Sequence, residues 1–331
     1  MKINIGIIGY GNLGKATEQI ILSKHKYNLV AIFSRRMVKS KFNTIIESYE
    51  NISLYKDKID IMLLCGGSFD DLEKQTTDAL FYFDSINTFD NHKKIPSEFE
   101  RLDKIAKNTN HRLIMSCGWD PGIFSIIRTI FFSLSKTKPI VFWGKGISMG
   151  HSDAIRKVKN VTDGIEFTIP NKNALKLARL GKFYENEPLH FRQCFVVAEK
   201  KYQKTIYEKI KNIPDYFKGQ PTTVEFVSHE ELLKLKSKMA HCGEIISNFK
   251  TLDGSNNWFN FKLKTASNPN LTATILTSYI DAIINLKQDK KIGAFTPLDI
   301  PISYLFDKSY HNKLLSDLCW NNYYFITKIK I

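Results

Sequence analysis

Two aspartates carry the clearest chemical signal in the sequence. Asp90 and Asp120 each follow an apolar run typical of a buried strand, the first in Asp90-Asn91-His92 and the second in the run from Gly118 to Gly122. Because parallel strands of an open α/β sheet present their carboxyl ends at one edge, we expect both carboxylates to lie together there. Such a pair could hold a substrate ammonium and accept its proton. A single aspartate at such a position is more often a helix N-cap, and Asp120 before Pro121 also fits that structural role.

A glycine pattern indicates which other molecule is held at this edge. The run from Gly9 to Gly14 has the spacing GxGxxG, directly after an apolar run and before an amphipathic helical segment. In this pattern Gly9 permits a tight turn, Gly11 lets the backbone approach a pyrophosphate, and Gly14 lets the helix pack closely on the strand. Free N–H groups at the helix start attract the phosphates. Glycines also cluster in ordinary turns, but the strand before and the helix after favour a dinucleotide site.

The end of the second apolar run indicates which dinucleotide. A site that prefers NAD usually has Asp or Glu there, which binds the ribose 2′-hydroxyl. This chain has Ser34-Arg35-Arg36 instead. A carboxylate would repel a 2′-phosphate, whereas a guanidinium makes charge-assisted hydrogen bonds to it. The sequence therefore predicts NADP(H), with a solvated basic loop as the alternative.

Two further stretches are candidates for ligand contacts. Gly66-Gly67-Ser68 follows an apolar run that ends at Cys65, so it should lie near the cofactor, although a plain strand-helix loop is nearly as good an interpretation. Arg192 lies in the apolar run 191–198. Its planar guanidinium matches a carboxylate bidentately, which makes it the best candidate for a substrate anchor, against the common alternative of a surface-strand arginine.

These residues require elements that bring them together. Apolar runs at 3–8, 28–36, 59–65, 85–89 and 112–116 alternate with helical segments, which is typical of a Rossmann-type, doubly wound parallel sheet. Later strand-like runs at 140–142, 165–169, 191–198, 222–227, 244–249 and 257–263 predict a second, α+β domain. A helical pattern from Leu271 to Leu286 then returns the chain towards the first domain. We therefore expect a dinucleotide-binding domain over 1–120, a second domain over 121–270 to which the family resemblance described below assigns substrate binding and dimerisation, and a C-terminal segment over 271–331.

Composition limits the other classes of function. With 331 residues, 43% of them hydrophobic, the chain can bury a substantial core, and it has no run of apolar residues long enough for a membrane span. The five cysteines have no CxxC spacing, so we expect neither a disulfide framework nor a metal site. The net charge of +15 comes from diffuse lysines without a nucleic-acid-binding motif. We expect a cytoplasmic protein with no nucleic-acid or membrane partner.

Beyond these separate signals, the chain resembles the meso-diaminopimelate dehydrogenase family along nearly its whole length. The motifs that carry the resemblance occur in order and with the correct spacing, and they are the runs 8–14, 32–36, 118–122, 142–144, 150–154, 192–197, 214–217, 268–269 and 293–296. This match is far more specific than a dinucleotide fingerprint alone.

The resemblance implies an activity and a set of roles. The activity is NADP-dependent, reversible oxidative deamination of the D-centre of meso-2,6-diaminopimelate to L-2-amino-6-oxopimelate and ammonia, which serves lysine and peptidoglycan precursor supply. It implies that Asp90, Asp120 and Trp143 line the reacting D-centre. The distal L-centre is held by Thr168, Arg192, His241 and Asn268. A homodimer with a second domain that closes over the cofactor is implied as well.

The cofactor contacts that we expect follow from the fingerprint, the strand ends and the family motifs together. They are Gly9, Gly11, Asn12, Leu13, Gly14, Ser34, Arg35, Arg36, Cys65, Gly66, Gly67, Ser68, Gly118, Trp119, Pro121 and Gly122.

Two positions depart from the family pattern. The sequence reads His241-Cys242-Gly243-Glu244 where the family has a His-Gly-Gly-His-like run, so the loop around His241 could have a different shape. Cys117 replaces a familiar threonine, which leaves open an NADP-dependent semialdehyde dehydrogenase with Cys117 as nucleophile and His92 or His151 as its base. A third class, a non-catalytic NADPH-sensing module, would have no need of the paired aspartates.

Overall fold

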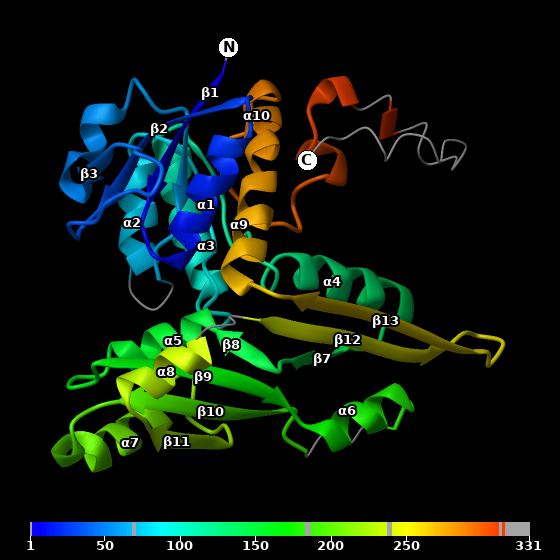
Figure 1. Cartoon of the computed structure of the whole chain (residues 1–331). Helices are drawn as coiled ribbons and strands as arrows, with labels where there is room; N and C mark the ends of the chain where they lie inside the picture. Colours follow the sequence, from blue (N-terminus) through cyan, green and yellow to red (C-terminus); the bar gives the residue numbers. More distant parts are fainter. Residues whose placement is uncertain (1, 68–70, 183–186, 237–239, 311–312, 315–331) are drawn as a thin grey trace.

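The computed structural model has two lobes, with described residues 2–67, 71–182, 187–236, 240–310 and 313–314 (Figure 1). The first lobe, at the top of Figure 1, contains both the beginning of the chain and the segment after residue 267. The second lobe lies below it and is formed by the middle of the chain. Ser68 and the tail 315–331 lie outside the described residues.

A parallel sheet forms the centre of the first lobe. Within the described residues it has seven strands in the order β14-β6-β5-β4-β1-β2-β3, and every pairing is parallel. This is the order 3-2-1-4-5-6 of a Rossmann-type fold with one strand added at the edge, so the predicted fold class is confirmed. The strands are β1 (Ile3–Ile8), β2 (Tyr27–Ser34), β3 (Ile46–Ser48), β4 (Ile61–Leu64), β5 (Asp84–Asn87), β6 (Arg112–Ile114) and β14 (Gly293–Phe295).

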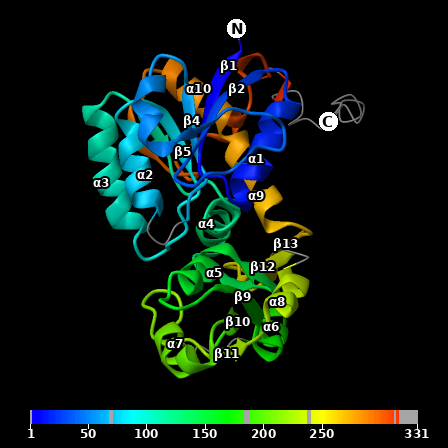
Figure 2. The ribbon, with the colours of Figure 1, turned by 60° about the vertical axis from the view of Figure 1, so that its left-hand side comes forward.

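Helices cover both faces of this sheet, which is why its strands read as nearly continuous apolar runs. Ile7 belongs to a cluster with residues of α1 (Asn12–Ser23), α9 (Asn268–Ser278) and α10 (Ile280–Gln288). Its neighbour Ile8 points to the other face and packs with α2 (Asp71–Leu80) and α3 (Ile95–Asn108). Figure 2 shows these two sets of helices on opposite sides of the strands. The 3₁₀ segment Tyr49–Tyr55 follows β3.

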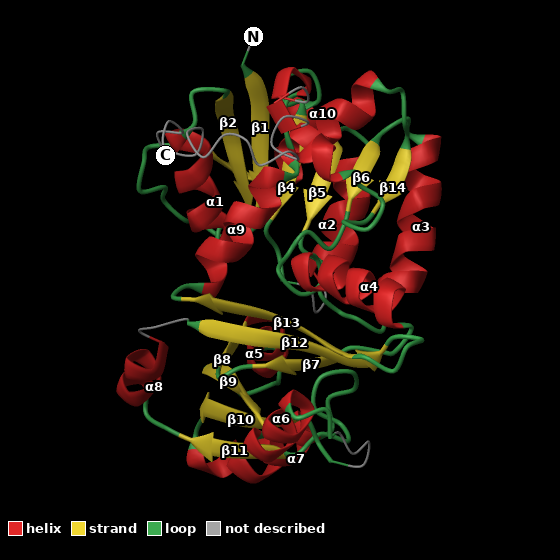
Figure 3. Cartoon of the chain, turned by 90° about the vertical axis from the view of Figure 1, so that its right-hand side faces the viewer, coloured by secondary structure: helices red, strands yellow, loops and turns green. Residues whose placement is uncertain are grey.

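The second lobe contains two smaller sheets (Figure 3). One has the order β11-β10-β9-β8, antiparallel except for the β10–β11 pair, and the other has the antiparallel order β13-β12-β7. The strands are β7 (Ile140–Trp143), β8 (Gly146–Ser148), β9 (Asp163–Pro170), β10 (His190–Val197), β11 (Thr222–Phe226), β12 (His241–Lys250) and β13 (Asn256–Thr265). The helices are α4 (Ile123–Ser135), α5 (Met149–Arg156), α6 (Lys172–Arg179), α7 (Gln203–Lys211) and α8 (His229–Lys236).

One sequence expectation needs correction. The helical pattern from Leu271 to Leu286 is interrupted at Tyr279, which ends α9 and precedes α10. The hydrophobic spacing runs through this break because both helices pack the same face on the first sheet. Among the described residues, no helix is long and apolar enough to cross a membrane.

Candidate active site

A cavity of about 910 Å³ opens where the carboxyl ends of the first sheet meet the second lobe. One wall contains the loops after β1, β2 and β4, and the facing wall contains Ser148, α5 and His241. Ligand pockets typically have about 300–1,000 Å³, so this volume is at the upper end of that range. Ligands of open α/β sheets bind at the carboxyl ends of the strands, and this cavity occupies that position.

The glycine loop forms a cradle in the first wall. Gly9 has φ +94°, a left-handed conformation that favours glycine. A Cβ added at Gly11 would meet nothing within 4 Å, so backbone faces open space there. Gly11 is also the N-cap of α1, whose first turn has neither a side-chain cap nor an acidic residue. The helix start therefore presents free N–H groups and the positive end of its dipole to the cavity.

The two arginines after β2 lie at the end of the same cavity. Arg35 and Arg36 both line it. In this structure Arg35 Nη2 donates a 2.7 Å hydrogen bond to Asp71 Oδ1, at the start of α2. Lys157 of the second lobe lies 3.8 Å from the same oxygen. Arg35 and Lys157 thus flank the Asp71 carboxylate, and Arg36 in the same lining adds a further positive charge for an anionic ligand.

Most of the cofactor residues predicted from the sequence line this cavity. These are Gly9, Gly11, Asn12, Leu13, Ser34, Arg35, Arg36, Cys65, Gly66, Gly67, Gly118, Trp119 and Pro121. Gly14 and Gly122 are not in the lining. A Cβ on Gly14 would lie 2.1 Å from the Gly9 carbonyl oxygen, and one on Gly122 would lie 1.8 Å from that of Gly118, so both positions require glycine for packing.

The two predicted catalytic aspartates both line the cavity. A Cβ added at Gly150 of α5 would lie 2.9 Å from Oδ2 of Asp90, so the glycine leaves room for this carboxylate between the lobes. Asp120 is held more tightly, because its side chain is only 2% exposed and its Oδ2 accepts two hydrogen bonds. The Trp143 indole N–H donates to Oδ2, and Arg128 lies 2.9 Å from Oδ1.

Arg128 is a residue that our reading of the sequence missed. It lies on α4 and donates a 3.1 Å hydrogen bond from Nη1 to Asp120 Oδ2, while its Nη2 donates to Ser125 and lies 2.9 Å from Oδ1 as an ion-pair contact. A charge-assisted hydrogen bond of this kind fixes a carboxylate in orientation as well as compensating its charge. The signal in the sequence is the single charged residue of an Ile- and Phe-rich stretch, eight positions after the aspartate.

Trp143 does not line the cavity and instead acts through Asp120. Its backbone N–H donates a 2.7 Å hydrogen bond to His190 Nε2, and the two rings stack with centroids 4.8 Å apart. His190 was also missed, because a single histidine at the start of a strand gives no signal on its own. Together, His190, Trp143 and Arg128 fix the position of Asp120.

The protonation of His190 gives a first testable prediction. Burial, with a smaller contribution from Arg192, lowers the pKa of His190 to about 3 from an ordinary value of 6.5. The stability that depends on neutral His190 is present above the unfolded pKa, and it is lost as the pH falls through 6.5 towards the folded pKa. We expect the His190→Gln variant, which keeps an acceptor for Trp143 N–H but does not titrate, to lose less stability in acid. The free energy of unfolding of each protein can be measured in urea at about pH 7 and pH 5. Between these two pH values the native protein should lose about 2 kcal/mol more than the variant. An unchanged difference would contradict the assignment.

His241 and Asn268 also line the cavity, beside Trp119. The His241 ring lies 4.8 Å from the Trp119 ring, and burial lowers the pKa of His241 to about 4. Asn268 Oδ1 accepts a 3.0 Å hydrogen bond from the Trp119 indole. The imidazole is therefore neutral at physiological pH, and because its Nδ1–H donates to the Cys242 carbonyl at 2.9 Å, its Nε2 is left as an acceptor.

The departure from the family pattern after His241 has a structural counterpart. Glu244 is buried in β12 and accepts two hydrogen bonds from Arg179 of α6, at 2.8 Å and 2.5 Å, as well as one from Asn260. Cys242 Sγ donates to the carbonyl of Gly144 at 2.6 Å. Both side chains are used within the second lobe, and His241 keeps its place in the cavity wall.

Arg192 and Thr168, which the sequence predicts as distal anchors, lie together but behind the cavity wall. They oppose each other on β10 and β9, and Arg192 Nη1 donates to the Thr168 hydroxyl. The missed residue here is Glu166, which is completely buried and lies 3.4 Å from Arg192 Nη1. The signal in the sequence is an acid two residues before Thr168, on the same face of an apolar strand.

Cys117 lacks the properties of a nucleophile. It is 0% exposed, it is not among the residues that line the cavity, and burial raises the pKa of its thiol well above 9. The proposed bases are occupied elsewhere, since His151 contacts Ser148 and Tyr216, and His92 contacts Trp143. The structure therefore argues against a thiolate mechanism.

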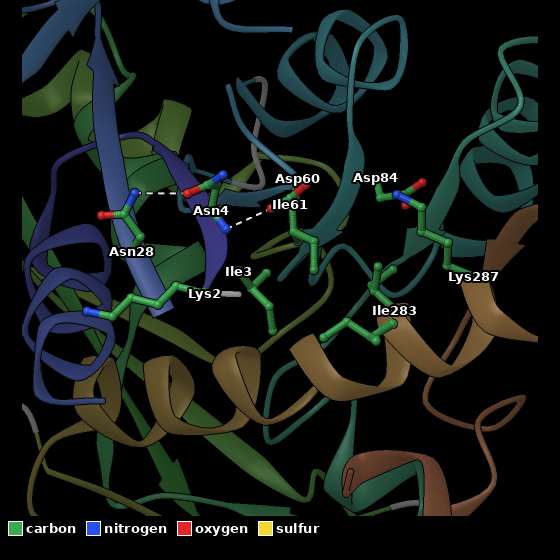
Figure 4. A pocket seen from close by; sticks show the side chains of 10 residues that line it. Lys2, Ile3, Asn4, Asn28, Asp60, Ile61, Asp84, Ile283 and Lys287 are labelled. Atoms are coloured by element: carbon green, nitrogen blue, oxygen red, sulfur yellow. Dashed lines mark hydrogen bonds between the residues drawn. The ribbon is translucent and has the colours of Figure 1, made fainter. Parts of the chain in front are cut away.

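A second hollow, of about 560 Å³, lies at the opposite edge of the first sheet (Figure 4). Its polar groups already bond to one another: the Asn28 amide donates to Asn4 Oδ1, and Asn4 N–H donates to Asp60, both at 2.8 Å. Asp84 is paired with Arg112. This edge holds the amino ends of the strands, where open α/β sheets do not bind their ligands.

Comparison with known proteins identifies the family. Residues 118–267 match the model of the diaminopimelic acid dehydrogenase C-terminal domain. The chain is 40% identical over 315 residues to a meso-diaminopimelate D-dehydrogenase of Ureibacillus thermosphaericus, which covers 93% of this chain and 97% of that protein. It is 42% identical over 324 residues to one of Acetivibrio thermocellus, with 93% and 95% covered.

Solved structures agree over nearly the whole length. An engineered D-amino acid dehydrogenase bound to NADP⁺ has a TM-score of 0.90 at 31% identity, with 97% of this chain and all of that chain covered. The C. glutamicum DAP dehydrogenase in complex with DAP has a TM-score of 0.86 at 32% identity, with 97% and 99% covered. Identity and coverage together show that the chain belongs to the meso-diaminopimelate D-dehydrogenase family.

Proposed function

We propose that this protein catalyses the reversible, NADP-dependent oxidative deamination of the D-centre of meso-2,6-diaminopimelate to L-2-amino-6-oxopimelate and ammonia, in lysine and peptidoglycan precursor supply. The observation that carries the proposal is that one cavity is lined by the glycine loop, by Arg35 and Arg36, and by the two aspartates. Relatives at 40% and 42% identity are named for this dehydrogenase activity.

The residues present fit NADP. Gly11 leaves open space at the uncapped start of α1, where a pyrophosphate would be held by free N–H groups. The positive excess around Arg35, Arg36 and Lys157 suits a 2′-phosphate. The cofactor, when bound, supplies the hydride acceptor for the substrate α-carbon.

At the reacting end, Asp90 and Asp120 hold the substrate ammonium and remove its proton. Hydride can leave the α-carbon only when the nitrogen lone pair is available, so this proton transfer comes first. The hydrogen bonds from Arg128 and from the Trp143 indole, both to Oδ2, keep Asp120 in one orientation. Water then adds to the substrate iminium carbon, and ammonia leaves. Holding the reacting atoms in line contributes several kcal/mol, up to about 7–11.

At the distal end, we propose that Arg192, Thr168, His241 and Asn268 bind the L-centre. Support comes from the neutral imidazole of His241 in the cavity wall and from the cluster of Arg192 and Thr168 behind it. A site that satisfies a second amino acid centre by hydrogen bonds rejects analogues without it by large factors, about 10⁴ in favourable cases.

NADPH formation at alkaline pH tests this function. The purified protein should oxidise meso-diaminopimelate with NADP, and turnover should be much slower with the LL isomer, with D-lysine or with NAD. Absence of turnover despite NADPH binding would contradict the proposal and favour the sensing module.

We also propose that the protein is a homodimer formed through the second lobe. The helix α4 is mostly apolar, yet only Phe124 in it is buried. Phe131 and Phe124 pack on β13, whereas Ile130, Phe132 and Leu134 are 43%, 51% and 58% exposed on the rest of the helix. Large apolar side chains that are exposed together on one helix are normally covered, and a second copy of the chain would supply that cover.

Sedimentation analysis checks the dimer. The native protein is expected at twice the mass of one chain, and the double variant Phe132→Glu, Leu134→Glu at the mass of one. The matched control is Leu54→Glu, which changes a leucine that is 68% exposed in the first lobe and should leave the dimer intact. A native protein that sediments as a single chain would refute the proposal. The cytoplasmic location and the domain limits at residues 120 and 270 stay predictions.

A further inference from the structure

Glu166 is a buried charge that the proposed mechanism does not use. It lies in the middle of β9 with no exposed surface. The Thr168 hydroxyl contacts both of its carboxylate oxygens, at 3.0 Å and 3.1 Å, and Arg192 Nη1 lies 3.4 Å from Oε1. Its backbone N–H donates to the hydroxyl of Ser152, which lines the cavity. Carboxylates are almost never fully buried unless they are paired, so the negative charge needs an explanation.

The pairing of Glu166 with Arg192 is incomplete. Arg192 is 8% exposed, and its Nε has no hydrogen-bond partner among the described residues. A purely structural pair of this kind is usually bidentate, because buried ions need all their hydrogen bonds satisfied. The unused N–H gives the guanidinium the capacity to bind a further anion. Arg112, in the structural pair with Asp84, has the same unused Nε, so the position of Arg192 next to the cavity is the observation that distinguishes it.

The cluster of Glu166, Thr168 and Arg192 lies one strand behind the cavity wall. Ser148 of β8, which lines the cavity, is the register partner of Glu166. Gly146 is the partner of Thr168, and a Cβ added at Gly146 would lie 2.5 Å from the Cα of His241. The cluster therefore adjoins the part of the cavity assigned to the distal end of the substrate.

We propose that Glu166 is a specificity-determining residue: it supplies the negative charge of the distal subsite, so that the subsite selects a substrate end that carries an ammonium as well as a carboxylate. This inference rests on the proposed function. The distal L-centre of meso-diaminopimelate is a zwitterion, and the Arg192–Glu166 pair has the same balance of charges. When the substrate carboxylate engages Arg192, its ammonium replaces the guanidinium as the cation near Glu166.

A substrate analogue whose distal end has a carboxylate but no ammonium would leave one charge of the cluster uncompensated. Arg192 would turn to the carboxylate, and Glu166 would remain as a buried anion with a weakened partner, which is costly. Burial already raises the pKa of Glu166 to about 7, against the opposing effect of Arg192. Rejection of such an analogue comes from a charge that is left uncompensated, which is an effective route to specificity.

The test compares two substrates in two matched variants. D-2-Aminopimelate has the same carbon chain and both carboxylates as meso-diaminopimelate but lacks the distal amino group. In Glu166→Gln we expect the ratio of kcat/KM values for the two substrates to fall at least about tenfold, because the KM for meso-diaminopimelate rises while the analogue is used equally well or better. Glu166→Asp, which keeps the charge, should retain the preference.

Glu244→Gln is the control, since Glu244 is another buried glutamate bonded to an arginine in the second lobe, outside the cavity lining. It should leave the ratio unchanged. Equal losses for both substrates in Glu166→Gln, or an unchanged ratio in a variant that still binds NADPH, would overturn the inference and leave the proposed function standing. If the native enzyme oxidises neither substrate, the proposed function itself fails, and the inference fails with it.

Discussion

Replacing Asp120 with asparagine is expected to lower kcat for oxidation of meso-diaminopimelate by about 10²- to 10⁴-fold, the usual contribution of a positioned acid or base. Asparagine has nearly the same shape but cannot accept the substrate proton. It also leaves the Arg128 guanidinium facing a neutral group. Steady-state kinetics should show the loss in kcat, with the KM for NADP little changed, because Asp120 lies at the substrate end of the cavity.

Asp84→Asn is the matched control for this experiment. Asp84 is also buried, with 4% of its side chain exposed, and it also forms an ion pair with an arginine, Arg112. It lies at the opposite edge of the sheet, beside the second hollow (Figure 4). Its loss should lower the free energy of unfolding without lowering kcat. A kcat for Asp120→Asn close to that of the native enzyme would refute the catalytic role.

Removal of both guanidinium groups in Arg35→Ala, Arg36→Ala should raise the KM for NADP by roughly 10²- to 10⁴-fold. Each charge-assisted bond to a 2′-phosphate contributes about 1.5–3 kcal/mol, and a factor of ten corresponds to about 1.4 kcal/mol. Catalysis with NAD, which has no 2′-phosphate, should be unaffected. The double variant should therefore prefer NADP over NAD less strongly than the native enzyme does.

Because Arg35 is paired with Asp71, the experiment needs a control for effects on the fold. Asp71 keeps Lys157 as a neighbour when Arg35 is removed, so the start of α2 does not lose all its compensating charge. Arg101→Ala, which removes a guanidinium bonded to Glu98 on α3, should leave both cofactors unaffected. Equal losses with NADP and NAD in the double variant would show that the arginines support the fold and not the phosphate.

Much of the first lobe could be predicted because its signals are local. Strands buried on both faces appear as continuous apolar runs, and the glycine loop needs only the residues around it. The three-residue strands β3 and β14 are too short to show any period. The helix α4 was missed although Ser125, Arg128, Thr129 and Ser133 form a polar stripe at helical spacing, because its dense Ile and Phe residues also fit a buried strand.

The residues of the candidate site also fall into two groups, those that local sequence signals predict and those that they do not. Asp90 and Asp120 were found because strand ends in a parallel sheet share an edge, a rule that requires no knowledge of partners. Arg128, His190 and Glu166 became visible only in three dimensions, since each acts on a residue contributed by another element. The sequence shows which side chains are present in β9 and β10 but not that Arg192 and Glu166 meet.

The placement of β14 has a consequence for the synthesis of the protein. This strand pairs with β6, but it leaves the ribosome only after the whole of residues 115–292 has been made. Until then β6 is an unprotected edge of a nascent sheet, and exposed edges recruit other strands. Correct folding during translation therefore depends on the intervening lobe folding promptly by itself and staying clear of that edge. A chain truncated before residue 293 would lack β14 and keep β6 as an open edge, which favours aggregation.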